Sequence, residues 1–246
     1  MKHLSTLFLL LSGFLGYAQD ATEIIRKSEN KLRGDHSSGT VQMTIERPNW
    51  SRTMTMKTWS RGTEYSMILV TEPARDQGTV YLKRKSEIWN WVPSVERTIK
   101  LPPSMMSQSW MGSDFTNDDL VQESSILKDY THKLLGEETI RGTACYKIQL
   151  TPKEDAAVVW GKVISWISKD DYLQLKTEFY DEDGELVNTM EGFEIKELGG
   201  RRLPSKLVMT PANEPGNRTI MRQLELNFDD EQPEGFYTTQ NMKRIR

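Results

Sequence analysis

Three carboxylates stand close enough in the chain to suggest acid–base or metal chemistry. They are Asp114, Asp118 and Asp119, which follow a glycine and a serine in the middle of the sequence. Paired carboxylates can transfer protons or hold a metal. The same residue types are also favoured where a helix begins, because they accept hydrogen bonds from its free N–H groups and stabilise its positive end. Helix capping is the simpler interpretation, so we expect no catalytic role and no metal here.

Other catalytic signatures are missing from the sequence. His36 and His132 lie far apart and have no metal-ligand spacing. The chain contains no GxSxG elbow, no glycine-rich phosphate loop and no HExxH motif. We therefore expect a protein that is not an enzyme and that carries no cofactor.

The single cysteine, Cys145, lies in a predicted strand, where a small buried apolar residue is the default interpretation. One cysteine excludes an internal disulfide, so stability must come from an apolar core. Asp181, Glu182 and Asp183 precede Gly184 and resemble part of a calcium loop. The spaced ligands and distal glutamate of an EF-hand are absent, which favours a solvated hairpin turn.

The N-terminus predicts a secretory signal peptide over residues 1–18. Lys2 and His3 precede an apolar run over residues 4–15, and Gly16 and Ala18 supply the small residues of a cleavage site. The run is shorter than the ~20 residues of a spanning helix; a buried helix is the alternative. The mature chain would begin at Gln19 instead of the cysteine of a lipid-anchored protein, so we expect a soluble exported protein.

Net charge limits the kinds of partner. The whole chain has 32 basic and 35 acidic residues, and removal of the signal peptide takes away Lys2, which leaves 31 against 35 and a net charge of −4. This balance predicts no nucleic-acid binding. With no linker or repeat in residues 19–246, we expect one β-rich domain.

The predicted elements begin with a helix over residues 20–32, which Gly34 can end. Alternation of period two then follows in short runs separated by turns containing proline, glycine and asparagine. Such runs occur on both sides of the centre of the chain. They predict an antiparallel meander without βαβ units.

The centre of the chain, residues 89–120, begins as a short aromatic strand with a hairpin-like return over residues 95–99, and the segment after Pro102 and Pro103 then breaks the alternation. Its apolar members after Pro102 and Pro103 follow one face of an interrupted helix, and Thr116 with Asp119 forms a variant of the capping box. Methionine and tryptophan fill cores as readily as they line adaptable binding surfaces. The spacing alone leaves both alternatives open.

The segments WVPSVERTIK (91–100) and SWMGSDFTNDDL (109–120), with GFYTTQNMK (235–243) near the end, resemble the bacterial outer-membrane lipoprotein-sorting protein family. That family is a branch of the LolA-like superfamily of periplasmic carriers. The resemblance implies a mainly β fold, an incompletely closed antiparallel β-barrel with an N-terminal helix. Short helices and loops would cover an apolar cavity that takes acyl chains.

Two sets of residues are then candidates for lipid binding. Period-two patterning selects residues for the concave side of the sheet, with a bulge required between the second and the third: Met54, Met56, Trp59, Met67, Leu69, Trp89 and Trp91. Trp89 and Trp91 should at least share a face. A movable cover over residues 105–115 would contribute the others: Met105, Met106, Trp110, Met111 and Phe115. In the alternative, these side chains form a sealed core.

The resemblance implies a periplasmic, monomeric carrier that moves a lipid or lipoprotein between the membranes of the envelope. The alternative is an accessory subunit of an RND-type inner-membrane transporter. A purely structural domain is the third interpretation.

Overall fold

The computed structural model describes residues 20–121 and 125–245; the predicted signal peptide and Gln19 lie outside this range. The chain begins with helix α1 (Ala21–Arg33), close to the predicted span. The Asp20 side chain accepts a hydrogen bond from the Thr22 N–H, and Gly34 ends the helix at a φ of 64°. No helix in the described ranges combines the length and apolar character needed to cross a bilayer.

Within the described residues, 13 antiparallel strands form one sheet. The first half of the chain supplies β1 (His36–Arg47), β2 (Trp50–Arg61), β3 (Tyr65–Glu72), β4 (Val80–Arg84), β5 (Glu87–Val92) and β6 (Arg97–Lys100). The second half supplies β7 (Tyr130–Ile140), β8 (Thr143–Pro152), β9 (Lys162–Ser168), β10 (Gln174–Tyr180), β11 (Leu186–Leu198), β12 (Arg201–Pro211) and β13 (Arg218–Asn227). The antiparallel meander predicted from the alternation is confirmed.

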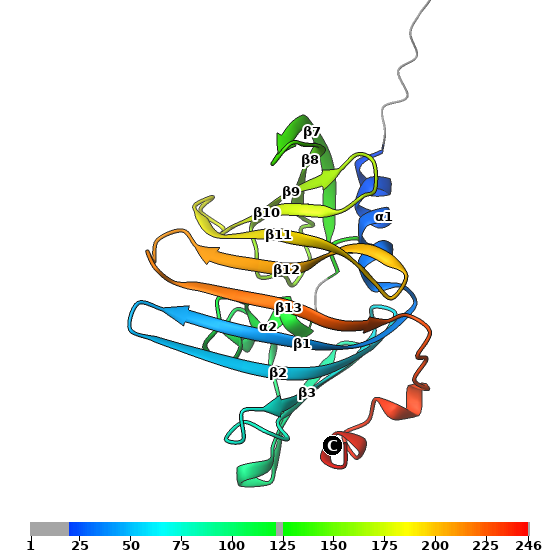
Figure 1. Cartoon of the computed structure of the whole chain (residues 1–246), viewed down its shortest axis with the longest axis vertical. Helices are drawn as coiled ribbons and strands as arrows, with labels where there is room; N and C mark the ends of the chain where they lie inside the picture. The colour runs from blue at the N-terminus through cyan, green and yellow to red at the C-terminus, as the bar shows by residue number, and fades with distance from the viewer. Residues whose placement is uncertain (1–19, 122–124, 246) are drawn as a thin grey trace, which may run out of the picture.

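The sheet has two halves, which we call fans. Strands β1–β6 form the first fan and β7–β13 the second. β1 pairs with β13, and each later or earlier strand pairs with its neighbour in sequence, out to edge strands β6 and β7 (Figure 1). The edges do not pair with each other, so the barrel is incompletely closed, as expected from the resemblance. Consecutive strands are joined by nine residues or fewer, except between β6 and β7.

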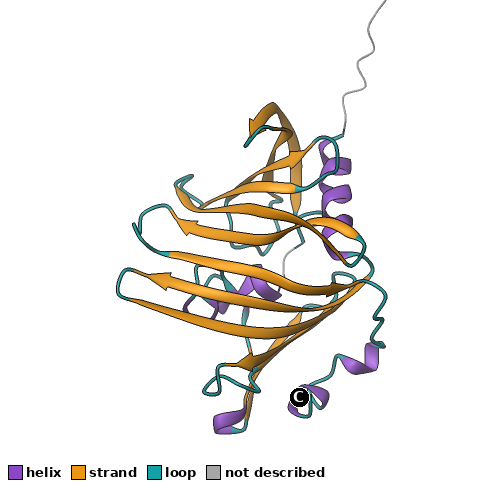
Figure 2. Ribbon diagram, viewed as in Figure 1, coloured by secondary structure: helices purple, strands orange, loops and turns teal. Residues whose placement is uncertain are grey.

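The β6–β7 connection must cross from one edge of the sheet to the other. It contains the short helices η2 (Pro103–Met105), η3 (Trp110–Gly112) and α2 (Asn117–Val121), and it lies behind β1 and β13 in Figure 2. We call the side of the sheet that packs against this connection and α1 the inner face, and the opposite side the outer face. The topology therefore places the predicted cover segment, residues 105–115, over the inner face.

Apolar side chains form three clusters. The inner cluster joins α1, the cover segment and both fans, through residues such as Ile24, Met43, Trp110 and Ile148. An outer cluster on β3 and β4 includes Tyr237 and Met242 from the end of the chain. This C-terminal segment contains η4 (Glu234–Phe236) and η5 (Asn241–Lys243). A third cluster surrounds Cys145 and Trp166.

Candidate functional site

An apolar cavity of about 210 Å³ lies on the inner face, between α1, α2 and the strands of the second fan. Tyr130, Leu150, Phe179 and Met209 are among the side chains that line it. Alternation explains how the strands build this wall. Thr177 and Phe179 on β10 both point inward because they are two residues apart.

Cross-strand neighbours extend the wall over β11 to β13. Met190 lies opposite Met209, and Leu207 lies opposite Met221. Paired residues project to the same side of a sheet, so these four side chains form one patch. Three of the four are methionines, whose flexible thioether side chains adapt to ligands of irregular shape.

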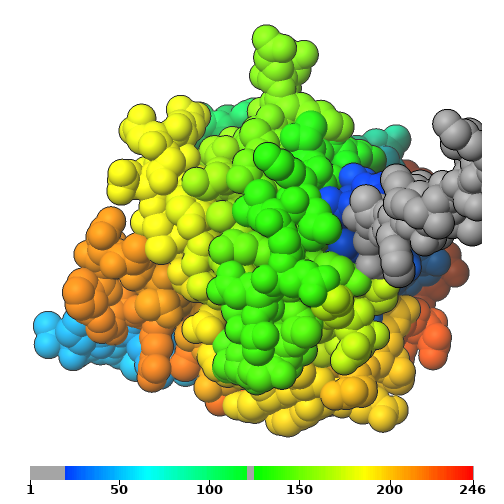
Figure 3. All heavy atoms as spheres, turned by 90° about the horizontal axis from the view of Figure 1, so that it is seen from above, coloured from blue at the N-terminus to red at the C-terminus, as the bar shows by residue number. Residues whose placement is uncertain are grey.

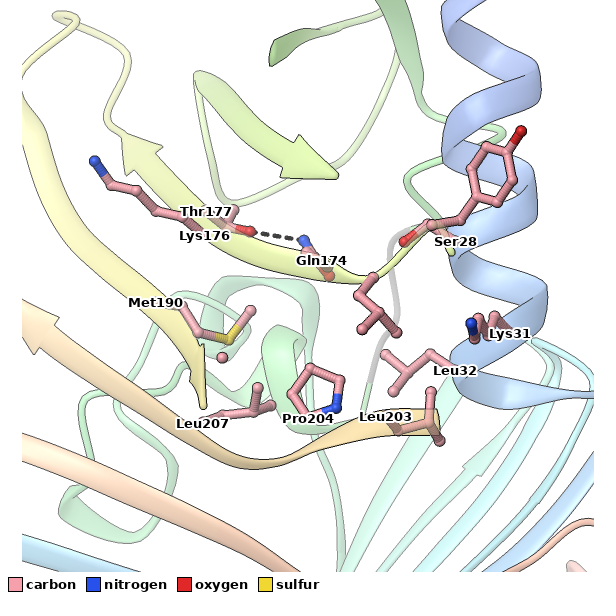
Figure 4. A pocket seen from close by; sticks show the side chains of 13 residues that line it. Ser28, Lys31, Leu32, Gln174, Lys176, Thr177, Met190, Leu203, Pro204 and Leu207 are labelled. Carbon is pink, nitrogen blue, oxygen red and sulfur yellow. Dashed lines mark hydrogen bonds between the residues drawn. The ribbon is translucent and has the colours of Figure 1, made fainter. Parts of the chain in front are cut away.

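A smaller enclosed space of about 50 Å³ adjoins the cavity beside the end of α1 (Figure 4). Leu32, Met190 and Leu207 line both spaces. The amide of Gln174 donates to the Thr177 hydroxyl at 2.6 Å, which satisfies the polar groups at this boundary. The wall between α1 and the sheet is therefore mainly apolar, with Lys31 and Lys176 among the residues that line it.

The cover segment closes on itself as a loop. The backbone N–H of Trp110 donates to the Phe115 carbonyl at 2.8 Å, and Ser109 forms a β-bridge with Thr116. Trp110 is fully buried and lies 5.2 Å, ring to ring, from Tyr81. Phe115 lines the cavity. The loop thus presents one aromatic side chain to the sheet and one to the cavity.

A partly buried ion pair holds the tip of this loop. Both Arg47 guanidinium nitrogens donate to the Asp114 carboxylate, at 2.9 and 3.1 Å, and one also donates to the Gly112 carbonyl at 3.0 Å. The Thr219 hydroxyl donates to the same carboxylate at 2.6 Å. The Arg52 guanidinium donates to the Met111 carbonyl at 2.9 Å. Asp114 therefore fastens the cover segment to β1 and β13.

The predicted capping box at the start of α2 is confirmed. The Thr116 N–H donates to Asp119 Oδ2 at 2.8 Å, and the Asp119 N–H donates to the Thr116 hydroxyl at 3.1 Å. Trp160 Nε1 donates to Asp119 Oδ1 at 3.1 Å. Burial raises the pKa of Asp119, against the lowering effect of these hydrogen bonds. No group of three or more potential metal ligands occurs among the described residues.

The seven strand residues predicted for one concave side divide between the two faces. Met54 and Met56 lie in the inner cluster. Trp59, Met67 and Leu69 lie in or against the outer cluster. The expected bulge between Met56 and Trp59 does not exist: β2 pairs with β1 without interruption, so residues three apart point to opposite sides.

Trp89 and Trp91 share a face, as expected, but it is the outer one. There the C-terminal segment covers them together with Trp59, whose ring lies 5.6 Å from Phe236. In the cover segment, Met106, Trp110 and Phe115 belong to the inner cluster, and Met105 and Met111 pack against it. Phe115 is the member of the predicted set that lines the cavity.

The side chains that sequence reasoning missed come mainly from the second fan. Leu207 and Met209 alternate on β12, and Thr177 and Phe179 alternate on β10, so the period-two signal was present. The signal does not say which fan carries the cavity. Trp160, in the loop before β9, carries no periodic signal at all.

Comparisons with known proteins agree with this architecture. A family model described as "Uncharacterized protein" matches residues 62–244, which is most of the chain. A search among curated proteins found no match. Three crystal structures share the fold over nearly their whole lengths.

The first is a DUF1329 family protein from Desulfovibrio piger, with a TM-score of 0.82 and 22% identity over 90% of this chain and 97% of that one. A putative outer membrane lipoprotein-sorting protein domain from Vibrio parahaemolyticus gives 0.81 and 22%, over 91% and 98%. A LolA superfamily protein from Nitrosomonas europaea gives 0.79 and 24%, over 91% and 99%. The chain therefore belongs to the family of the matching model, and it has the fold that the LolA superfamily shares with the outer membrane lipoprotein-sorting domain.

Proposed function

We propose that this protein is a non-enzymatic carrier that holds an acyl chain of a lipid or lipoprotein in the inner cavity and moves it between envelope membranes through the periplasm. One observation carries the proposal: an apolar, methionine-rich cavity lies on the inner face of an open sheet, beneath a connection that crosses from edge to edge. The name of the Vibrio parahaemolyticus relative, a putative outer membrane lipoprotein-sorting protein domain, is consistent with it.

The cavity is small for this task as it stands. Its 210 Å³ falls below the ~300–1,000 Å³ of sites that enclose drug-sized ligands. A long acyl chain would therefore enter only as Phe115, Leu32 or the methionines of the wall shift. Methionine and leucine side chains change rotamer readily, and loosely packed walls oppose such movement least.

Energetics favour such a compromise between holding and releasing. Burial of a methylene gains ~0.8 kcal/mol, so a sixteen-carbon chain gains roughly 13 kcal/mol on leaving water. The chain gains almost none of this when it leaves a bilayer. A carrier must therefore bury the acyl chain about as favourably as a membrane does, without packing so rigid that it prevents release. The methionine side chains of the inner cavity are suited to that role.

Extraction tests the proposal. The purified protein would be extracted with organic solvent, and the extract analysed by mass spectrometry. We expect acyl-bearing molecules in about stoichiometric amount. The control is a Met209→Glu variant, which places a charge in the cavity wall and should carry none while it remains folded. An empty extract from the wild type, together with no binding of a fluorescent fatty acid, would contradict the carrier function.

A further inference from the structure

A second hollow lies at the end of the molecule away from α1. There the β1–β2, β10–β11 and β12–β13 turns project side by side, as seen from two directions in Figures 1 and 3. The cover segment, the β10–β11 turn and the end of β12 enclose a cleft of about 660 Å³. Its volume falls within the range of sites that hold small molecules.

The cleft and the apolar cavity share a wall. Phe115 and Trp160 line both of them. Both residues are buried, and the Trp160 ring lies 5.1 Å from Phe179 on the cavity side. Trp160 also donates to Asp119, which fixes its indole at the boundary. A linear molecule would reach from one space into the other by displacing the Phe115 side chain.

The cleft is the more polar of the two spaces, although Glu29, Arg33, Asp118 and Asp119 are also among the residues that line the cavity. The cleft presents the hydroxyl-bearing residues Ser107, Ser113 and Thr116, and its rim carries Asp181, Glu185 and Glu214. Arg47 is the cation among its lining residues. Because that guanidinium is engaged by Asp114, its charge is compensated, and the three rim carboxylates leave the cleft negative.

We propose that this cleft holds the polar, amine-bearing headgroup of a lipid whose acyl chain occupies the apolar cavity. This inference rests on the proposed carrier function and specifies its cargo. The Ser113 and Thr116 hydroxyls already bond to neighbouring backbone, so the exposed Ser107 hydroxyl binds the neutral part of the headgroup. The carboxylates favour a cation and oppose an anion. The cleft is open to solvent, and its volume fits a headgroup but not a folded protein moiety.

Three single-chain probes of equal length test the preference: hexadecylamine, hexadecanol and palmitic acid. Each would displace a fluorescent apolar probe from the wild-type protein at pH 7 and low salt. We expect the amine to bind more tightly than the alcohol by about threefold to tenfold, and the acid to bind most weakly. The preference should shrink at high salt, because salt screens exposed charges.

Two double variants, each lacking two carboxylates, test whether the preference for the amine comes from the cleft. Glu185→Gln with Glu214→Gln removes two carboxylates from the cleft and should reduce the amine-to-alcohol ratio by about threefold or more. Glu182→Gln with Asp183→Asn removes two charges from the same β10–β11 turn outside the cleft lining and should leave the ratio unchanged. Both pairs should retain the affinity for hexadecanol.

The outcomes separate the two proposals. Equal affinities for the three probes, or the same change in both variant pairs, would overturn the headgroup site and leave the carrier function standing. Tighter binding of palmitic acid than of hexadecylamine would do the same. Failure of all three probes to bind would overturn both.

Discussion

The ionisable side chains of the cover region are held by specific neighbours. Asp114 is paired with Arg47, and Asp119 accepts hydrogen bonds on both of its oxygens. These interactions hold both side chains in position, although Asp114 also lines the cleft and Asp119 lines the apolar cavity. At the scale of single residues, Asp114 therefore fixes the cover segment and Asp119 fixes the start of α2.

Asp119 should make stability depend on pH. Burial raises its pKa above the ordinary value of 3.8, so the folded protein keeps a proton that the unfolded chain has already released. Wild-type stability should then fall as pH rises from about 3.8 to the folded pKa. Asp119→Asn has no carboxyl group to titrate at this position. As pH rises through this window, the unfolding free energy of the wild type should therefore fall relative to that of the variant. Urea unfolding at several pH values measures it; a constant difference would contradict the raised pKa.

Cys145 should be chemically inert in the folded protein. Its side chain is fully buried, its thiol donates to the Thr143 carbonyl at 3.4 Å, and burial raises the pKa of the thiol. The thiolate is the reactive form, so a thiol reagent at pH 8 should modify Cys145 only after denaturation. Cys145→Ala and Cys145→Ser should leave fatty-acid binding intact, with the serine variant the less stable because it buries a hydroxyl. Loss of binding at unchanged stability would indicate a role for the thiol.

At the scale of elements, the cover segment combines packed and wall-forming side chains. Trp110→Ala should cost ~3–5 kcal/mol of folding stability, because the indole is fully buried. Phe115→Ala should cost a similar amount, and in addition it should raise the dissociation rate of a fluorescent fatty acid, because Phe115 lines the cavity.

Stopped-flow release from the folded fraction of each variant distinguishes these roles. Trp110→Ala, normalised to folded protein, serves as the control for the effect of lost stability alone. Faster release in both variants would mean that the whole segment governs exchange. Unchanged release in Phe115→Ala would contradict its place in the wall.

The sequence predicted elements well where a local signal sufficed. The α1 helix with its stop at Gly34 and the capping box at Thr116 depend on neighbours a few residues apart. The facing of β3 could not be predicted this way. Met67 and Leu69 are buried on one side and Ile68 and Val70 on the other, so both faces are apolar and alternation gives no preference. The cover over the outer face comes from residues far away in sequence.

At the scale of the molecule, the C-terminal segment serves as the second cover of the sheet. Tyr237 and Met242 are fully buried against β3 and β4, and Arg84 pairs with Glu234 at 3.2 Å. Removal of residues 233–246 would leave the outer cluster exposed, and such a patch promotes association. The truncated protein should melt earlier and self-associate, yet still bind a fatty acid in the inner cavity, which that segment does not line.

Light scattering, thermal melting and probe binding measure these effects. Tyr237→Phe is the companion variant: its hydroxyl is buried without a hydrogen-bond partner among the described residues, so its loss should be nearly neutral or stabilising. A truncated protein that stays monomeric and stable would show that the outer face needs no cover.

The pairing of β1 with β13 has a consequence for synthesis. All other pairs in the sheet join strands that are consecutive in sequence. The β1–β13 pair, in contrast, joins residues as far apart as Thr44 and Ile220. As the chain is made from its N-terminus, the edge of β1 that faces β13 stays unpaired until β13, the last strand of the sheet, has been made. Unpaired edges of this kind attract other chains, and late, distant closure is slow. A chain that ends shortly before β13 would leave this edge unpaired and should aggregate more readily than the whole protein.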